Sequence, residues 1–338
     1  MPVNVTFRSQ LLGGVSDFSQ STNIPIFAQT INLVELIVLL ARYQEEGQKL
    51  APKVYITNDI LSLCSMLPDN ELIKIGSCSA DVSGIKLVLK KCAPLASGGW
   101  MIFIQNNNSK INYGLFKGSS NPIAVLVDDV TMTKNDDLIV VKVFQIAENC
   151  VEVKSNNGGQ HYIFLDHRQE ESLPPLHYLD RLVEAITSNT KEKYYESIKS
   201  FLTRLLFESL RESHGCIIAV TNMSRVPKLL TIDSVILDEP IDFGLLVENL
   251  MNKKIEQSYI SSKGHLLRGM LNSDGILIFD NRARLLGYNC FIKVSKKAEV
   301  IGGARRRAFN TLTNNLGRGL CGVFMQSQDG WSDFEERK

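Results

Sequence analysis

The sequence predicts an α/β protein of two domains, and three observations support this fold class. The chain has 338 residues, which suits two domains of ordinary size. Its hydrophobic share of 44% and charged share of 22% are typical of a folded globular protein. Helically spaced apolar residues also alternate with short strand-like runs in both halves. We therefore expect a C-terminal mixed-sheet α/β domain with flanking helices, preceded by a separate α/β (α+β) N-terminal domain.

The N-terminal domain is expected to span residues 1–165. Residues 31–47 have helical spacing and end at Gly47. Short apolar runs separated by Gly-, Asn- and Ser-rich turns then predict strands at 53–57, 85–90, 100–105, 123–127 and 138–144. A last pair of strands, near 150–154 and 161–165, flanks a turn at 155–159.

A boundary follows at residues 166–175, which are charged and end in Pro174 and Pro175. We assign residues 166–192 to a linker and the start of a helix, and residues 193–338 to the second domain. A long helical stretch covers 176–212, with an interruption at 188–190.

The remaining elements of the second domain follow from the same patterns. Strands are expected at 216–220, 275–279, 285–292 and 320–325, and helices at 242–251, 266–271 and 304–316. The charged residues 333–338 are interpreted as a frayed, solvated tail.

Charge and hydropathy exclude several classes of protein. Lys and Arg number 37 and Asp and Glu 36, so a globally basic nucleic-acid binder is not expected. No apolar run reaches the roughly 18 residues that a membrane span needs, and the N-terminus has no signal-peptide pattern. The seven cysteines form no CxxC pair and are interpreted as reduced thiols. These features favour a cytoplasmic protein without a membrane anchor.

Three short segments between residues 272 and 330 carry potential chemistry. In the first, Asp274 and Gly275 stand directly before an apolar strand, where a carboxylate is anchored and a ligand can approach the backbone. Taken alone, this pattern is more typical of a simple Asp-Gly turn.

The second segment places Gly302 and Gly303 before Arg305, Arg306 and Arg307 at an expected helix start. Free N–H groups and the helix dipole favour an anion there, and arginine forks bind phosphate in bidentate fashion. A solvated basic face is the alternative. The third segment, residues 324–330, ends a strand in a polar turn with Ser327 and Asp329.

Together, these segments resemble the diadenylate cyclase domain, the module that makes the second messenger cyclic di-AMP from two ATP. The family carries Asp-Gly-Ala, then Gly-Thr-Arg-His-Arg-Ala about thirty residues later, then a Ser-Glu-Glu-type turn. The counterparts are residues 274–276, 303–308 and 327–330, and the strand that starts at Gly215 and the hairpin at 284–288 also fit. The resemblance covers about residues 195–338.

The resemblance implies a role for each matching position. Asp274, Arg305 and Arg307 would be catalytic: the carboxylate orients the ribose 3′-hydroxyl and a metal ion, and the arginines hold the triphosphate. Asp329 would be a second metal-binding carboxylate, with Mg²⁺ or Mn²⁺ as cofactor. The nucleotide would also contact Gly275, Ile292, Gly303, Ala304, Arg306 and Ser327.

Three positions depart from the family pattern. Ala304 replaces threonine, Arg306 replaces histidine and Ile276 replaces alanine. The first two changes motivate an alternative function, a catalytically inactive module that binds ATP or cyclic di-AMP as a sensor. A protein that contacts nucleic acid through residues 305–307 is a third alternative, but no aromatic residues interleave with these arginines.

The expected reaction also sets the expected assembly. One domain holds one ATP, so closing a two-nucleotide ring requires two cyclase domains face to face, in a homodimer or a higher oligomer. Residues 1–165 occupy the place of a sensor domain, and we expect a regulatory role from that position alone.

Overall fold

We describe the protein from a computed structural model. The structure describes residues 7–22, 30–107, 110–119, 121–124, 126–165, 176–231, 233–292, 303–327 and 331–337. Contacts divide the chain into two compact units, one of Met1–Ser120 with Ala124–Glu171 and one of Asn121–Ile123 with Ser172–Lys338. Each unit is built around its own mixed sheet, of seven and six strands respectively, which confirms the predicted α/β class.

The sheet of the first unit has the order β4-β6-β5-β3-β7-β8-β9, in which only β3 and β5 pair in parallel. The strands are β3 (Val54–Thr57), β4 (Glu71–Ser79), β5 (Met101–Asn107), β6 (Lys110–Lys117), β7 (Val140–Ala147), β8 (Cys150–Ser155) and β9 (Gln160–Phe164). A separate two-stranded ribbon joins β1 (Gln44–Glu45) to β2 (Gln48–Lys49).

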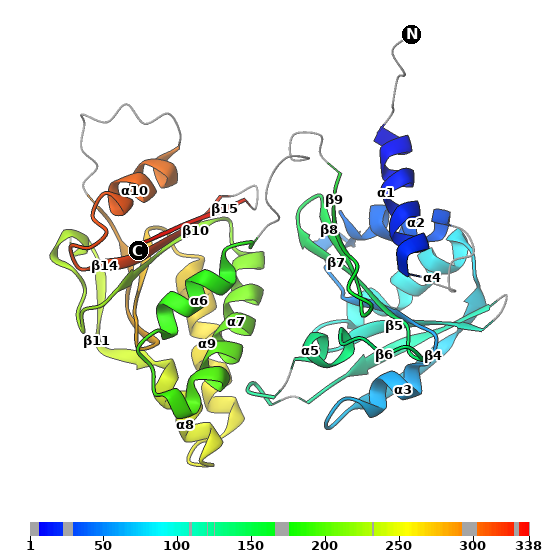
Figure 1. The fold of residues 1–338 in the computed structure, drawn as a ribbon, viewed down its shortest axis with the longest axis horizontal. Coiled ribbons are helices and arrows are strands. Elements are labelled where there is room, and N and C mark those ends of the chain that lie inside the picture. Colours follow the sequence, from blue (N-terminus) through cyan, green and yellow to red (C-terminus); the bar gives the residue numbers. More distant parts are fainter. Residues whose placement is uncertain are drawn as a thin grey trace, which may run out of the picture. The chain divides into compact units, whose positions relative to one another are not determined.

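Helices pack on both faces of this sheet. One face lies in a core with α1 (Phe7–Thr22), α2 (Thr30–Leu40) and α4 (Val82–Cys92), which continues into the 3₁₀ turn η1 (Ala93–Leu95). The other face is covered in part by α3 (Ile60–Ser65) and α5 (Val127–Thr131). Figure 1 shows α1, α2 and α4 gathered on the same side.

Two predicted strands of this unit are wrong. Residues 85–90 belong to α4. Asp81 caps its start by accepting the N–H of Gly84, and Lys90 and Lys91 lie in its last turn. The buried residues of α4 recur at helical spacing, and a short apolar run does not by itself distinguish a helix from a strand. In the range 123–127, the first described residues continue the turn that contains Pro122, and Val127 is the first residue of α5. Asp128 and Asp129 favour a helix start there.

The sheet of the second unit has the order β11-β13-β12-β10-β14-β15. Only β10 and β12 pair in parallel. The strands are β10 (Cys216–Thr221), β11 (Val235–Asp242), β12 (Ile276–Asp280), β13 (Arg284–Cys290), β14 (Leu320–Gln326) and β15 (Ser332–Glu336).

Helices sandwich this second sheet (Figure 1). One face packs against α6 (Leu179–Thr187), α7 (Tyr195–Glu212), α8 (Phe243–Met251) and α9 (Gln257–Leu271). The opposite face packs against α10 (Ala304–Thr313), and the 3₁₀ turns η3 (Glu192–Tyr194) and η4 (Lys228–Leu230) complete the unit. The predicted interruption at 188–190 separates α6 from η3 and α7, as expected. Among the described helices, none has the length and apolar character needed to cross a membrane.

The end of the chain corrects another prediction. Residues 333–336 lie in the edge strand β15 and are not a frayed tail. Phe334 is buried against Phe324 of β14, its partner in the register, and packs in the core below α6 and α7. This one apolar side chain among charged neighbours gave no alternating pattern from which a strand could be predicted.

Candidate active site at one end of the second sheet

The strand register brings three of the sequence segments to the same end of the sheet. Ile276 of β12 lies beside Ile217 of β10 in parallel register, and Gln326 of β14 lies opposite Cys216. Gly215, Asp274 and Ser327, each one or two residues beyond these pairs, therefore stand side by side where their strands begin or end. Because neighbouring strands are about 4.8 Å apart, the backbones of Asp274 and Ser327 are separated by about 10 Å.

A fourth strand extends this row. Cys290 of β13 pairs with Ile276, so the chain beyond it brings Ile292 to the same end, on the far side of Asp274. Ile292 is half-buried and packs against the apolar cluster below α10. Its position is that of an apolar wall next to the carboxylate.

Asp274 itself is exposed, and its Oδ1 accepts the N–H of Gly275 at 2.9 Å. Gly275 has a φ of +93°, and a Cβ there would lie 2.9 Å from the Cα of Asn289. A side chain at this position would be strained and would collide with backbone, so only glycine fits. Ile276, where the family has alanine, is buried in the core below α10.

The start of α10 faces this row of residues. Gly303 is the N-cap and supplies no side-chain cap, so the first N–H groups, at Ala304 and Arg305, have no acceptor within the helix. The Arg305 side chain reaches the start of β10, because a Cβ at Gly215 would lie 3.0 Å from Arg305 Nη1. The same Cβ would lie 2.9 Å from the carbonyl carbon of Ser327. Burial raises the pKa of the Cys216 thiol to about 12, and the nearby charge of Arg305 acts in the opposite direction.

The other two arginines of α10 are placed differently. Arg306 Nη1 forms an ion pair with Asp333 Oδ2 of β15 at 2.8 Å. Arg307 is exposed in the first turns of the helix. The structure therefore brings Arg305 to the sheet end and engages the Arg306 guanidinium with β15.

Ser327 carries an unsatisfied polar atom. Its Oγ is buried and has no hydrogen-bond partner in the part of the chain that the structure describes. Its N–H donates to the carbonyl of Trp331 at 2.9 Å, which fixes the backbone at this position. The hydroxyls of Ser234 and Ser332 are likewise buried without a partner among the described residues, so the position of Ser327 at the sheet end is what makes its Oγ a candidate donor to a ligand. Asp329, predicted to bind metal, lies outside the described residues.

The described residues contain no group of three or more His, Cys, Asp or Glu side chains that could hold a metal ion. Asp274 supplies one exposed carboxylate at the sheet end. Mg²⁺ is typically bound through one or two carboxylates together with the phosphates of a substrate and several waters. Asp274 therefore fits a metal ion that arrives with a nucleotide.

Sequence reasoning missed three residues of this site. Gly215 was seen only as the start of a strand, and its positive φ of +91° depends on the folded backbone. Asp333 was excluded because residues 333–338 were taken as a tail, and Trp331, which directly follows the polar turn, was given no role. A tryptophan directly after a polar turn was the one available signal.

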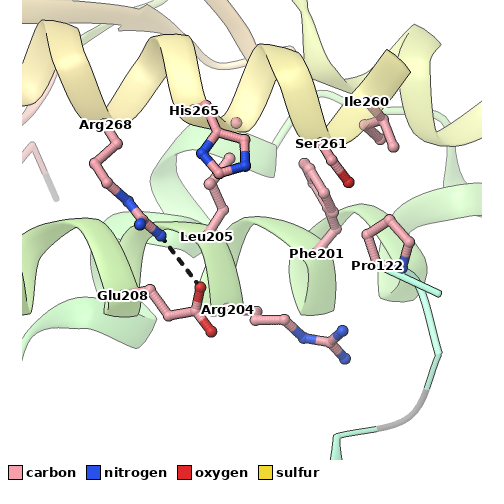
Figure 2. A pocket seen from close by; sticks show the side chains of 10 residues that line it. Pro122, Phe201, Arg204, Leu205, Glu208, Ile260, Ser261, His265 and Arg268 are labelled. Carbon is pink, nitrogen blue, oxygen red and sulfur yellow. Dashed lines mark hydrogen bonds and ion pairs between the residues drawn. The ribbon is translucent and has the colours of Figure 1, made fainter. Parts of the chain in front are cut away.

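Two hollows of the described structure lie away from these residues. In the second unit, a hollow of about 150 Å³ lies between α7 and α9, and its lining includes Leu205 and Gly264. Figure 2 shows Arg268 and Glu208 beside it, which form an ion pair of 3.4 Å. In the first unit, a polar hollow of about 360 Å³ lies over β4, β5 and β6, next to Lys74. Neither contains a residue of the sequence motifs.

Comparison of the chain with protein-family models, with curated proteins and with solved structures gave no match. Any functional assignment therefore depends on the motif residues and on the geometry of the sheet end.

Proposed function

We propose that the protein is a diadenylate cyclase, a nucleotidyltransferase that joins two ATP molecules into cyclic di-AMP and releases two pyrophosphates. The observation that carries the proposal is the convergence of Asp274, Arg305 and Ser327 at one end of one sheet, in segments far apart in the chain. Their chemistry suits a bound triphosphate with a ribose hydroxyl beside it.

The triphosphate would be held between α10 and the end of β14. The first N–H groups of α10 lack a side-chain cap and would favour an anion, and the Arg305 guanidinium lies over Gly215 next to Ser327. The unpartnered Ser327 Oγ would donate a hydrogen bond to a phosphate oxygen. Arg305 would also offset the negative charge that develops on the leaving pyrophosphate.

Asp274 would act on the attacking group. In the reaction, the ribose 3′-oxygen bonds to the α-phosphorus of the other ATP, the bond from that phosphorus to the pyrophosphate oxygen breaks, and the hydroxyl proton leaves to solvent. The exposed Asp274 carboxylate can accept a hydrogen bond from the hydroxyl and orient it. Mg²⁺ or Mn²⁺, bound by Asp274 and the phosphates, supplies charge neutralisation when present.

The reaction requires two such sites to face each other, because one site presents one 3′-hydroxyl and one α-phosphate. We therefore propose a homodimer of second units as the smallest active species, with higher oligomers also able to pair the sites. We assign the enzyme to the cytoplasm, where ATP is held, and propose that the first unit regulates it.

The test is to incubate the full chain with ATP and Mn²⁺ and to identify the product by mass spectrometry. Asp274→Asn should lower the rate of cyclic di-AMP formation by at least about a hundredfold, while ATP binding persists. Asp238→Asn is the matched control, since Asp238 is an exposed acid on the edge strand β11. An Asp274→Asn variant as active as wild type would contradict the role assigned to this carboxylate.

A second candidate is a module that binds nucleotide without turning it over. Ala304, which provides no hydroxyl, and Arg306, which pairs with Asp333, favour it. Binding of ATP or cyclic di-AMP without any product, in Mg²⁺ and in Mn²⁺, would select this function over the cyclase.

A further inference from the structure

Arg306 of α10 makes two contacts that join the helix to the last strand pair, with Asp333 and Trp331, and one within the helix, with Phe309. Its Nη1 lies 2.8 Å from Asp333 Oδ2 in β15. Its guanidinium carbon lies 5.2 Å from the ring centre of Trp331 and 5.6 Å from that of Phe309, within the range of cation–π attraction. Arg306 and Asp333 are both partly buried, with 37% and 26% of their side chains exposed, so water weakens this ion pair less than one on an open surface.

Trp331 and Asp333 belong to the same hairpin as Ser327. Asp333 lies opposite Met325 in the β14–β15 register, and Ser327 donates its N–H to the carbonyl of Trp331. The partners of Arg306 therefore sit within one or two ladder positions of the buried hydroxyl.

The start of α10 needs such an anchor. Three consecutive arginines at a helix N-terminus oppose the helix dipole, and no side chain caps this helix. On its buried side, α10 is held further along by Phe309 and Leu312 in the core. The Asp333 carboxylate and the Trp331 ring supply the attachment at its first turn.

From these contacts we propose that Arg306 is a positioning residue of the nucleotide site and not a ligand of the nucleotide. By fixing the first turn of α10 to the β14–β15 hairpin, it makes the N–H groups of α10, the Arg305 guanidinium and Ser327 Oγ face a single phosphate group. The proposal rests on the proposed nucleotide-binding function of this end of the sheet.

Asp333 provides the means to separate positioning from direct binding. A positioning arginine needs Asp333, so Asp333→Asn should weaken ATP binding as Arg306→Gln does. An arginine that binds phosphate directly competes with Asp333 for the same guanidinium, so Asp333→Asn would leave ATP affinity unchanged or raise it.

The experiment measures equilibrium binding of labelled ATP with Mn²⁺ to the full chain, together with steady-state formation of product. Arg306→Gln and Asp333→Asn should each weaken ATP binding about tenfold, with a smaller effect on the turnover number. The double variant should be no weaker than either single variant, because both changes break the same contact. Arg306→Lys keeps the charge that pairs with Asp333 but loses the planar guanidinium over Trp331, so its ATP affinity should fall between those of wild type and Arg306→Gln.

Hydrogen–deuterium exchange tests the same contact without any nucleotide. Amides at the start of α10 and in residues 331–336 should exchange faster in both Arg306→Gln and Asp333→Asn. If these variants loosen both segments but wild type binds no ATP, the attachment stands and the proposed function falls. Unchanged exchange, or loss of ATP binding in Arg306→Gln with wild-type binding in Asp333→Asn, overturns the positioning role.

Discussion

The guanidinium of Arg305 lies against the α-carbon of Gly215, so that a Cβ added to the glycine would come within 3.0 Å of Nη1. The glycine also has a φ of +91°, a conformation that other residues adopt only with strain. Because Gly215 has no side chain, the Arg305 guanidinium can lie beside Ser327. Any side chain at position 215 would fill that space.

Gly215→Ala should displace Arg305 and weaken ATP binding. The added methyl would also lie 2.8 Å from the carbonyl oxygen of Gln326, and strain plus contact should lower the free energy of unfolding by about 2 kcal/mol. Binding of labelled ATP and thermal unfolding measure the two effects. Gly269→Ala in α9 is the control, since nothing lies within 4 Å of a Cβ there, and it should keep or raise stability. An alanine at 215 with wild-type ATP affinity would contradict the placement of Arg305.

Ser327→Ala should separate binding from stability. The buried Oγ has no partner among the described residues, so its removal should leave the free energy of unfolding unchanged or raise it by about 1 kcal/mol. If this hydroxyl donates to a phosphate, ATP affinity should nevertheless fall several-fold. Denaturant unfolding and ATP binding on the same samples give both numbers. A variant that is destabilised but binds ATP normally would show that the hydroxyl has a structural partner instead.

Metal binding should depend on nucleotide. Because the described residues hold no cluster of three or more metal-binding side chains, Mn²⁺ alone should leave the melting temperature unchanged, whereas Mn²⁺ with ATP should raise it. Chelation with EDTA should stop product formation without unfolding the chain. A rise in melting temperature with Mn²⁺ alone would point to a preformed site that includes residues outside the described part.

The first unit should lose stability in acid through one buried network. Lys142 forms ion pairs with Asp128 at 2.7 Å and with Glu152 at 2.6 Å, and Tyr55 donates a hydrogen bond to Asp128. Burial raises the pKa of Asp128, but Lys142, Lys53 and the hydrogen bonds outweigh it and lower the pKa to about 2. A lowered pKa stabilises the fold above the ordinary value near 4, and this contribution is lost as the pH falls from about 4 to about 2.

Asp128→Asn should remove this pH dependence and lower stability near neutral pH by about 2 kcal/mol. Hydrogen exchange of the β7 and β8 amides between pH 5 and pH 2.5, corrected for intrinsic rates, measures it in the full chain. Asp136→Asn, at an exposed acid of the same unit, should behave as wild type. Equal acid sensitivity in Asp128→Asn and wild type would show that the Asp128 network does not cause the loss of stability in acid.

The fold class was predictable because its signals are local. Helices α6 and α7 present long amphipathic faces, and β10 and β12 are continuous apolar runs that need both faces buried. Residues 85–90 were misassigned because a short apolar run fits either period, and the decisive Asp81 cap lies outside that run. The edge strands β4, β11 and β15 were missed because their outward-facing residues give no alternation, and β6, which lies between β4 and β5, was missed as well.

The site was partly predictable for a related reason. Asp274, Arg305 and Ser327 were selected because their segments, in this order and spacing, resemble the motifs of the diadenylate cyclase domain. Their convergence depends on the long-range pairing of β10 with both β12 and β14, and the role of Gly215 depends on a backbone angle. The partners of Arg306 could not be predicted, because Asp333 comes close to Arg306 only through the pairing of β15 with β14.

The candidate site lies at the amino ends of β10 and β12, so a covalent label can be attached at the opposite end of these strands. The turn that follows β10, at residues 222–225, is roughly 20 Å away along the strand and carries exposed side chains such as Ser224. A dye or an affinity handle attached there would leave the candidate site chemically untouched. Most of the native thiols are buried, which slows their reaction, so an introduced cysteine in that turn could be labelled selectively.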